Sequence, residues 1–256
     1  MVAANSLTAA AASIVGHRVQ TTSLESTSAT TTYHRMTVDG VGVFYREAGP
    51  KNAPAIVLLH GFPSSSREFD TLIPLLATRY RLIAPDFPGF GQSDAPLPSS
   101  YAYTFDNLAR TINRLLEQLK INKYTFYLHD YGGPVGFRII LAHPERLQAL
   151  IVQNANAYKE GLGAKWAGIA QYWADPKAHP EVFDAFVSLT ATEQRHTLGT
   201  SHPERLTRTP GLTSTLTCRN PASARYKPIY CTTTGQTLLR TRRGKHGCLN
   251  ISRRLW

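Results

Sequence analysis

Short apolar runs alternate with amphipathic segments between about residues 41 and 153. Apolar runs bounded by turn residues are typical of buried parallel strands. They occur at 41–47, 55–60, 81–85, 124–129 and 149–153, and the intervening patterns predict helices at 67–76, 106–120 and 134–142. Strands that alternate with helices indicate the α/β class, with a parallel sheet, right-handed crossovers and helices on its faces.

The clearest helix is predicted at 106–120. Its apolar residues recur at helical spacing, so that they fall on one face of the helix. They are Leu108, Ile112, Leu115, Leu116 and Leu119. We therefore expect this face to cover the sheet.

The pattern changes after residue 153. Trp166, Tyr172 and Trp173 lie close together, and helical periodicity appears around 182–189. We interpret 154–204 as a helical cap on a core formed by 35–153. Residues 205–256 have no sustained apolar period, and we predict that they form a disordered tail unrelated to that fold. Residues 1–34 contain a polar run, and we expect them to be a disordered leader.

Charge divides the chain at the same place. The net charge is +11, yet residues 1–204 hold 17 basic and 17 acidic side chains, whereas 205–256 hold 11 basic ones, no acid and all three cysteines. A basic-tailed nucleic-acid-binding protein is therefore an alternative, based on the cluster Arg240, Arg242, Arg243 and Lys245. The tail lacks interleaved aromatic residues and metal-ligand spacing, so we expect no nucleic-acid partner, no metal and no cofactor.

The chain shows no membrane or export signal of the usual kind. No apolar run reaches about 18 residues, and no basic residue precedes Arg18. We expect a cytoplasmic protein without a membrane partner. The pattern leaves the oligomeric state open.

Three motifs follow three predicted strands. Residues 60–63 (HGFP) follow the strand at 55–60, residues 86–94 (DFPGFGQSD) follow the next, and residues 129–133 (HDYGG) join a strand to a helix. An aspartate at a sharp strand-to-helix turn, such as Asp130, suits a carboxylate nucleophile. The competing interpretation is a helix N-cap.

Residues 35–204 resemble the α/β-hydrolase superfamily, and within it the haloalkane dehalogenases and epoxide hydrolases. The resemblance implies that Asp130 is the nucleophile, at the turn where serine esterases have Gly-x-Ser-x-Gly. It also implies an oxyanion hole formed by the backbone N–H groups of Phe62 and Tyr131. Gly132 and Gly133 would let the helix approach the strand closely. A serine esterase or acyltransferase relative is an alternative, disfavoured because no serine occupies the turn.

The remaining motif residues are expected to be structural. His60, next to Gly61, is interpreted as a loop histidine, and Asp86 and Asp94 as residues that organise their turn. In the cap, Tyr158 and Tyr172 could donate to an epoxide oxygen, although packing is the competing interpretation.

The leaving group of the small-molecule substrate stays open. Haloalkane dehalogenases hold the halide with a tryptophan after the nucleophile and an asparagine or tryptophan after the His-Gly pair. Here those positions are Tyr131 and Phe62, so the residues that usually hold a halide are not present. Epoxides and haloalkanes therefore both stay candidate substrate classes.

The family's histidine base and its acid partner normally follow the cap. Residues 205–256 offer only His246 and no carboxylate, and Glu160 is the one acidic candidate nearby. We therefore predict a fold that is incomplete at its C-terminal end and an enzyme that forms the ester but does not hydrolyse it. Within codon degeneracy, the codons for 217–249 read one base earlier are compatible with a sequence that resembles the family. A frameshift is therefore our hypothesis for this range. We also expect the product to be poorly soluble.

Overall fold

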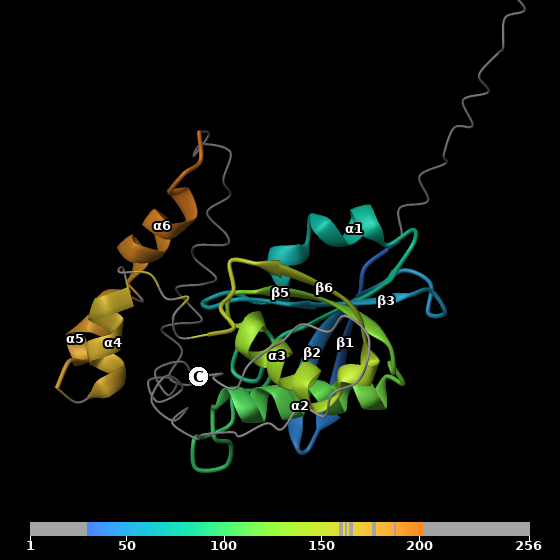
Figure 1. The fold of residues 1–256 in the computed structure, drawn as a ribbon, viewed down its shortest axis with the longest axis horizontal. Helices are drawn as coiled ribbons and strands as arrows, with labels where there is room; N and C mark the ends of the chain where they lie inside the picture. Colours follow the sequence, from blue (N-terminus) through green and yellow to red (C-terminus); the bar gives the residue numbers. More distant parts are fainter. Residues whose placement is uncertain are drawn as a thin grey trace, which may run out of the picture.

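The computed structural model describes residues 30–158, 161, 163, 166–175, 178–186 and 188–201. Six strands form one sheet in the order β1-β2-β4-β3-β5-β6 (Figure 1). They are β1 (Thr32–Val38), β2 (Val41–Ala48), β3 (Ala55–Leu59), β4 (Arg81–Pro85), β5 (Tyr124–His129) and β6 (Leu147–Gln153).

The sheet is mixed, whereas the sequence predicted a parallel one. Strands β4, β3, β5 and β6 are parallel, but β2 runs antiparallel to both β1 and β4. The tight turn at Asp39 and Gly40, where φ is +50° and +80°, accounts for the antiparallel pairing of β1 with β2. A two-residue turn can join only antiparallel strands. Strand β1 also begins at Thr32, inside the range expected to be a disordered leader.

Helices cover both faces of the sheet. Helices α2 (Phe105–Gln118) and α3 (Gly132–Ala142) lie on one face, and α1 (Leu72–Leu76) lies on the other (Figure 1). The helix predicted at 67–76 is in fact a short 3-10 helix, η1 (Ser66–Phe69), followed by α1. Pro74 explains the break, because its ring would clash with the carbonyl of Asp70 in a continuous helix. A second 3-10 turn, η2 (Pro144–Arg146), precedes β6.

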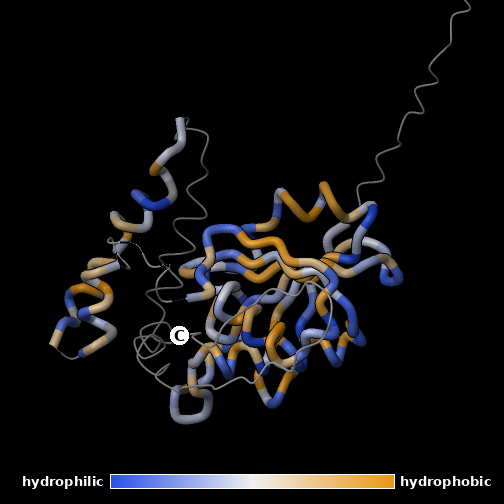
Figure 2. The backbone as a smooth tube through the Cα atoms, viewed as in Figure 1, coloured by the Kyte–Doolittle hydropathy of each residue, from blue (hydrophilic) through white to orange (hydrophobic). Residues whose placement is uncertain are grey.

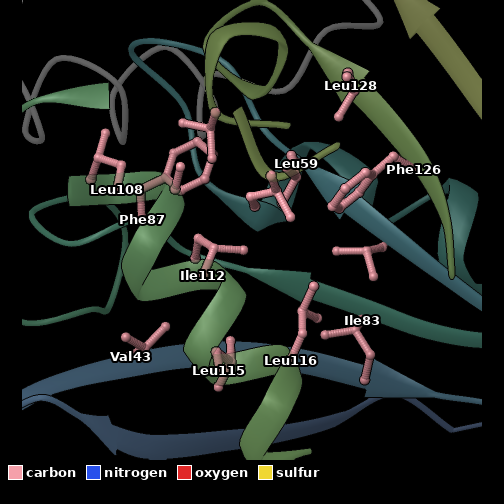
Figure 3. Packing of buried hydrophobic residues seen from close by; sticks show 14 of the residues in the cluster. Val43, Leu59, Ile83, Phe87, Leu108, Ile112, Leu115, Leu116, Phe126 and Leu128 are labelled. Carbon is pink, nitrogen blue, oxygen red and sulfur yellow. The ribbon is translucent and has the colours of Figure 1, made fainter. Parts of the chain in front are cut away.

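The apolar face of α2 packs on the sheet as predicted. Leu108, Ile112, Leu115 and Leu116 are fully buried, and Leu119 is partly buried against the same cluster. Figure 3 shows this helix lying over side chains from several strands, among them Val43, Leu59, Ile83 and Phe126. The hydroxyl of Thr104 caps the helix by accepting from the Asn107 N–H at 3.2 Å.

The described part of 154–204 contains three helices. They are α4 (Ala167–Ala174), α5 (Pro180–Phe186) and α6 (Leu189–Thr197), and they lie beside the sheet rather than on either of its faces (Figure 1). The sequence predicted helices here, and the interpretation of this range as a cap stays a prediction. Figure 2 shows long apolar stretches along the central strands, whereas the three cap helices alternate between apolar and polar positions.

Strand β6 lies at the edge of the described sheet. It pairs with β5 on one side, and Ile151 and Val152 are 45% and 46% exposed. The leader up to residue 29 and the range 202–256 lie outside the described residues. Predictions that concern them, including His246 and the basic tail, stay predictions, as does the one that concerns Glu160.

Candidate active site

The three sequence motifs meet at one edge of the sheet. Strands β4, β3 and β5 are adjacent and parallel. The motif segments at 86–94, 60–63 and 129–133 therefore all leave the sheet at its carboxyl edge. In open α/β sheets this edge is where ligands bind. The sequence-predicted residues Phe62, Asp130 and Tyr131 are brought together here.

Asp130 occupies the turn between β5 and α3. Its φ is +46°, in the left-handed region that a non-glycine residue adopts only when its surroundings impose it. The Gly133 N–H donates to the Asp130 carbonyl at 2.9 Å and closes the turn. This strand–turn–helix conformation points the carboxylate away from the helix and towards the loop after β3.

The carboxylate of Asp130 lies at the expected oxyanion donors. The Phe62 N–H donates to Oδ1 at 2.8 Å, and the Tyr131 N–H also bonds the carboxylate. Burial raises the pKa of the Asp130 carboxyl, while the two N–H groups and His129 act in the opposite direction. Both backbone groups predicted to form the hole thus contact the Asp130 carboxylate, and the roles of hole and nucleophile stay predictions.

Glycines make this close approach possible. A Cβ on Gly61 would lie 2.7 Å from the Asp130 Cβ, and a Cβ on Gly132 would lie 2.3 Å from the Leu59 carbonyl oxygen of β3. Gly132 therefore has the expected role. Gly133 instead faces Ala155, after β6. Successive helix residues point in different directions, so the two glycines cannot both face one strand.

His60, predicted to be a structural loop residue, is held in the interior by backbone groups. Its ring is fully buried, and its centroid lies 4.3 Å from that of Phe87. The Phe87 N–H donates to Nε2 at 3.1 Å, and Nδ1 lies 2.9 Å from the Gly61 carbonyl oxygen. Both ring nitrogens serve the backbone, so His60 is not available as a base.

Asp86 and Asp94 organise their turn, also as predicted. Buried Asp86 accepts from the N–H groups of Ser66 and Gln92 at 2.7 and 2.8 Å. Asp94 accepts from the Gly42 N–H at 2.7 Å, which joins the turn to β2. These contacts fix the segment at 86–94 beside the loop that carries Phe62.

The two residues whose N–H groups contact the carboxylate belong to a cluster of aromatic rings. Phe62 stacks on Tyr131 with 5.2 Å between centroids, and Phe105 contacts Tyr131 edge-on at 5.1 Å. From the cap, Phe186 at the end of α5 stacks on Phe62 at 6.1 Å, and Trp166 lies 6.1 Å from Phe186. Phe186 was missed in the sequence, where its only signal is an apolar residue in a helical pattern.

The pattern of residues 54–215 matches the family model for the alpha/beta hydrolase fold. That range covers more than half of the chain and includes every motif at the carboxyl edge of the sheet. The chain belongs to the α/β-hydrolase fold family.

Individual relatives of this α/β-hydrolase agree with the family assignment. An uncharacterised hydrolase of Saccharomyces cerevisiae is 47% identical over 150 residues, which are 58% of this chain and 51% of that protein. A haloalkane dehalogenase of Psychrobacter cryohalolentis is 38% identical over 113 residues, 44% of this chain and 37% of its own. The chain thus spans about half or less of the length of these curated relatives.

A solved structure shows the same fold. The epoxide hydrolase CorEH superposes with a TM-score of 0.65 at 22% identity, over 80% of this α/β-hydrolase and 75% of that chain. No helix in the described part of the chain is both long and apolar enough to cross a bilayer.

The two cap tyrosines of this α/β-hydrolase differ in their surroundings. Tyr172 on α4 is fully buried, whereas Tyr158, in the segment after β6, is partly exposed. Their role as substrate donors stays a prediction.

Sequence reasoning also missed an ion pair next to Asp130. His129 Nδ1 lies 2.9 Å from Glu68 Oε1, and this contact raises the pKa of His129 although burial opposes the shift. The two residues are 61 positions apart. No local pattern links them.

Proposed function

We propose that Asp130 is a carboxylate nucleophile that forms an ester with a small epoxide or haloalkane-type substrate. The observation that carries this proposal is the 2.8 Å bond from the Phe62 N–H to Asp130 Oδ1. With Oδ1 held by a donor, the second oxygen is the one that attacks. A helix N-cap interpretation gives no reason for an N–H from a loop 68 positions away to bind this carboxylate.

The chemical steps follow from this geometry. The free Asp130 oxygen attacks the electrophilic sp³ carbon, a C–O bond forms, and the carbon–halogen or epoxide carbon–oxygen bond breaks. A halide leaves with the electron pair, whereas an epoxide oxygen keeps the pair as an alkoxide that stays on the ester and takes a proton from water. Oδ1 becomes the ester carbonyl oxygen and stays at the Phe62 N–H, with the Tyr131 N–H as the second proposed donor. When water attacks the ester carbon, negative charge develops on that oxygen, where the donors stabilise it.

The aromatic surroundings indicate an apolar substrate. Phe62 and Tyr131, whose N–H groups contact the carboxylate, stack on each other, and Phe186 of α5 stacks on Phe62. Phe62 and Tyr131 occupy the positions where a halide would be held, and neither ring has a nitrogen donor. The alkyl or aryl part of the substrate, rather than its leaving group, would therefore supply most of the binding free energy.

We further propose that the reaction stops at the ester. Hydrolysis needs a base that activates water. Of the two histidines in the motifs at the carboxyl edge of the sheet, His60 is occupied by backbone groups and His129 by Glu68. His246 is the only histidine in 205–256, a range without a carboxylate to orient it. We expect stoichiometric labelling of the protein without turnover.

Labelling with styrene oxide tests both statements. We expect one intact epoxide added per chain, mapped by peptide mass spectrometry to Asp130, and a label that persists for hours. Asp130→Asn should abolish it because the amide is a poor nucleophile. Asp106→Asn is the matched control, since Asp106 is an exposed carboxylate paired with Arg138, and it should label like the wild type.

The outcomes separate the two claims. Equal labelling of wild type and Asp130→Asn would disprove the nucleophile. Catalytic turnover that disappears in Asp130→Asn would confirm the nucleophile and overturn the claim that the reaction stops.

A further inference from the structure

One carboxylate contacts both backbone segments that form the proposed site. Glu68 Oε1 lies 2.9 Å from His129 Nδ1, and Oε2 accepts a longer bond of 3.4 Å from the Gly61 N–H. His129 directly precedes Asp130, and Gly61 directly precedes Phe62. Glu68 therefore spans the two segments whose separation sets the bond between Phe62 and Asp130.

The element that carries Glu68 is itself fixed. It belongs to η1, whose N-cap Ser65 accepts from the Arg67 N–H. The buried Arg46 of β2 donates to the Ser66 hydroxyl at 2.7 Å and to Asp70 at 2.9 Å. Ser66 and Asp70 flank the turn of η1 that presents Glu68. Strand β2 thus holds this turn in place.

The surroundings of the pair favour a fixed geometry. The side chains of His129 and Glu68 are 32% and 17% exposed. Gly61 leaves no space for a side chain between them and Asp130, because its Cβ would lie 3.2 Å from His129 Nδ1. A small rotation of His129 would therefore move the turn that carries Asp130.

We propose that Glu68 and His129 are positioning residues that keep the Asp130 carboxylate at hydrogen-bond distance from the Phe62 N–H. Neither reacts with the substrate. Their effect is on the rate of ester formation, since misplacing the carboxylate by a fraction of an ångström lowers that rate strongly. The effect on the labelling rate rests on the proposed function of Asp130. The effect on the local structure of 60–69 rests on the contacts of Glu68 alone.

The kinetic test measures single-turnover labelling by styrene oxide at increasing concentrations. We expect Glu68→Ala to lower the saturating rate constant by about tenfold. The half-saturating concentration should stay within about twofold, because the aromatic rings that contact the substrate are untouched. Glu68→Gln should recover most of the rate, since its amide can accept from Gly61 and donate to a neutral His129.

Glu145→Ala is the matched control. His143 and Glu145 pair at 3.7 Å at the other end of α3. Removing Glu145 deletes the same kind of pair away from the site and should leave the labelling rate unchanged. Thermal unfolding of all three variants should differ little from the wild type, because a partly exposed ion pair contributes little stability.

A second measurement does not depend on reactivity. Hydrogen exchange by mass spectrometry on a peptide covering 60–69 should speed up in Glu68→Ala and not in Glu145→Ala. If the wild type shows no label at Asp130, the proposed function fails and this exchange measurement decides the positioning claim. An unchanged saturating rate together with unchanged exchange in Glu68→Ala would overturn the inference. So would a loss of rate in Glu68→Ala that is accompanied by a lower unfolding temperature and is not recovered in Glu68→Gln.

Discussion

At the scale of single residues, Asp130 combines two properties that oppose each other. Burial removes water from the carboxylate, which disfavours the charge and raises its pKa. The N–H groups of Phe62 and Tyr131 then stabilise the same charge. A nucleophile needs both, because a desolvated carboxylate is reactive and a held one is correctly oriented.

This balance predicts how labelling depends on pH. The pKa of Asp130 is raised by burial, so its protonated form persists to higher pH than in an exposed aspartate, whose pKa is about 3.9. Labelling by 1-bromohexane should fall on acidification with a midpoint above that value. The bromide does not titrate, so the profile reports the protein. A midpoint at or below the ordinary value would contradict the assignment.

The residue scale also shows what the sequence could and could not predict. Asp130, Phe62 and His60 follow strands in short motifs, so their place at the sheet edge was predictable from local patterns. Glu68 has no such motif, and its contact with His129 arises only when η1 docks against the end of β5. Phe186 likewise acquires its contact with Phe62 through tertiary packing.

At the scale of elements, α2 positions the sheet that carries the site. Its periodicity was sufficient to predict the helix and its buried face. The break at 70–71 and the antiparallel start of the sheet were not predicted, because Pro74 and the turn at 39–40 were not weighed against the apolar pattern. In both places local backbone stereochemistry overrode hydrophobic periodicity.

Truncating the buried face of α2 should destabilise the core. Leu116 is fully buried and packs with the central strands, whereas Leu119, on the same helix, is only partly buried. We expect Leu116→Ala to cost about 2–5 kcal/mol of unfolding free energy through lost burial and the cavity that remains. Leu119→Ala should cost clearly less. Urea unfolding measures both, and equal losses would contradict the described packing.

At the scale of the whole molecule, the described sheet ends on β6. A parallel edge strand exposes a row of backbone groups, and here it also exposes Ile151 and Val152. The chain spans 51% of its Saccharomyces cerevisiae relative, and no other described strand pairs with the outer side of β6. Such an edge favours pairing with another chain.

A charge on β6 should therefore reduce self-association. We expect Val152→Glu to lower the fraction of large species in sedimentation velocity, because a buried intermolecular strand pair would have to desolvate the carboxylate. Leu75→Glu is the control, since Leu75 is 75% exposed but lies on α1 rather than on a strand. Both substitutions lower the net charge of +11 by one, so a change in overall repulsion affects them alike. A larger effect of Leu75→Glu would place the association on α1 and contradict the role of the strand edge.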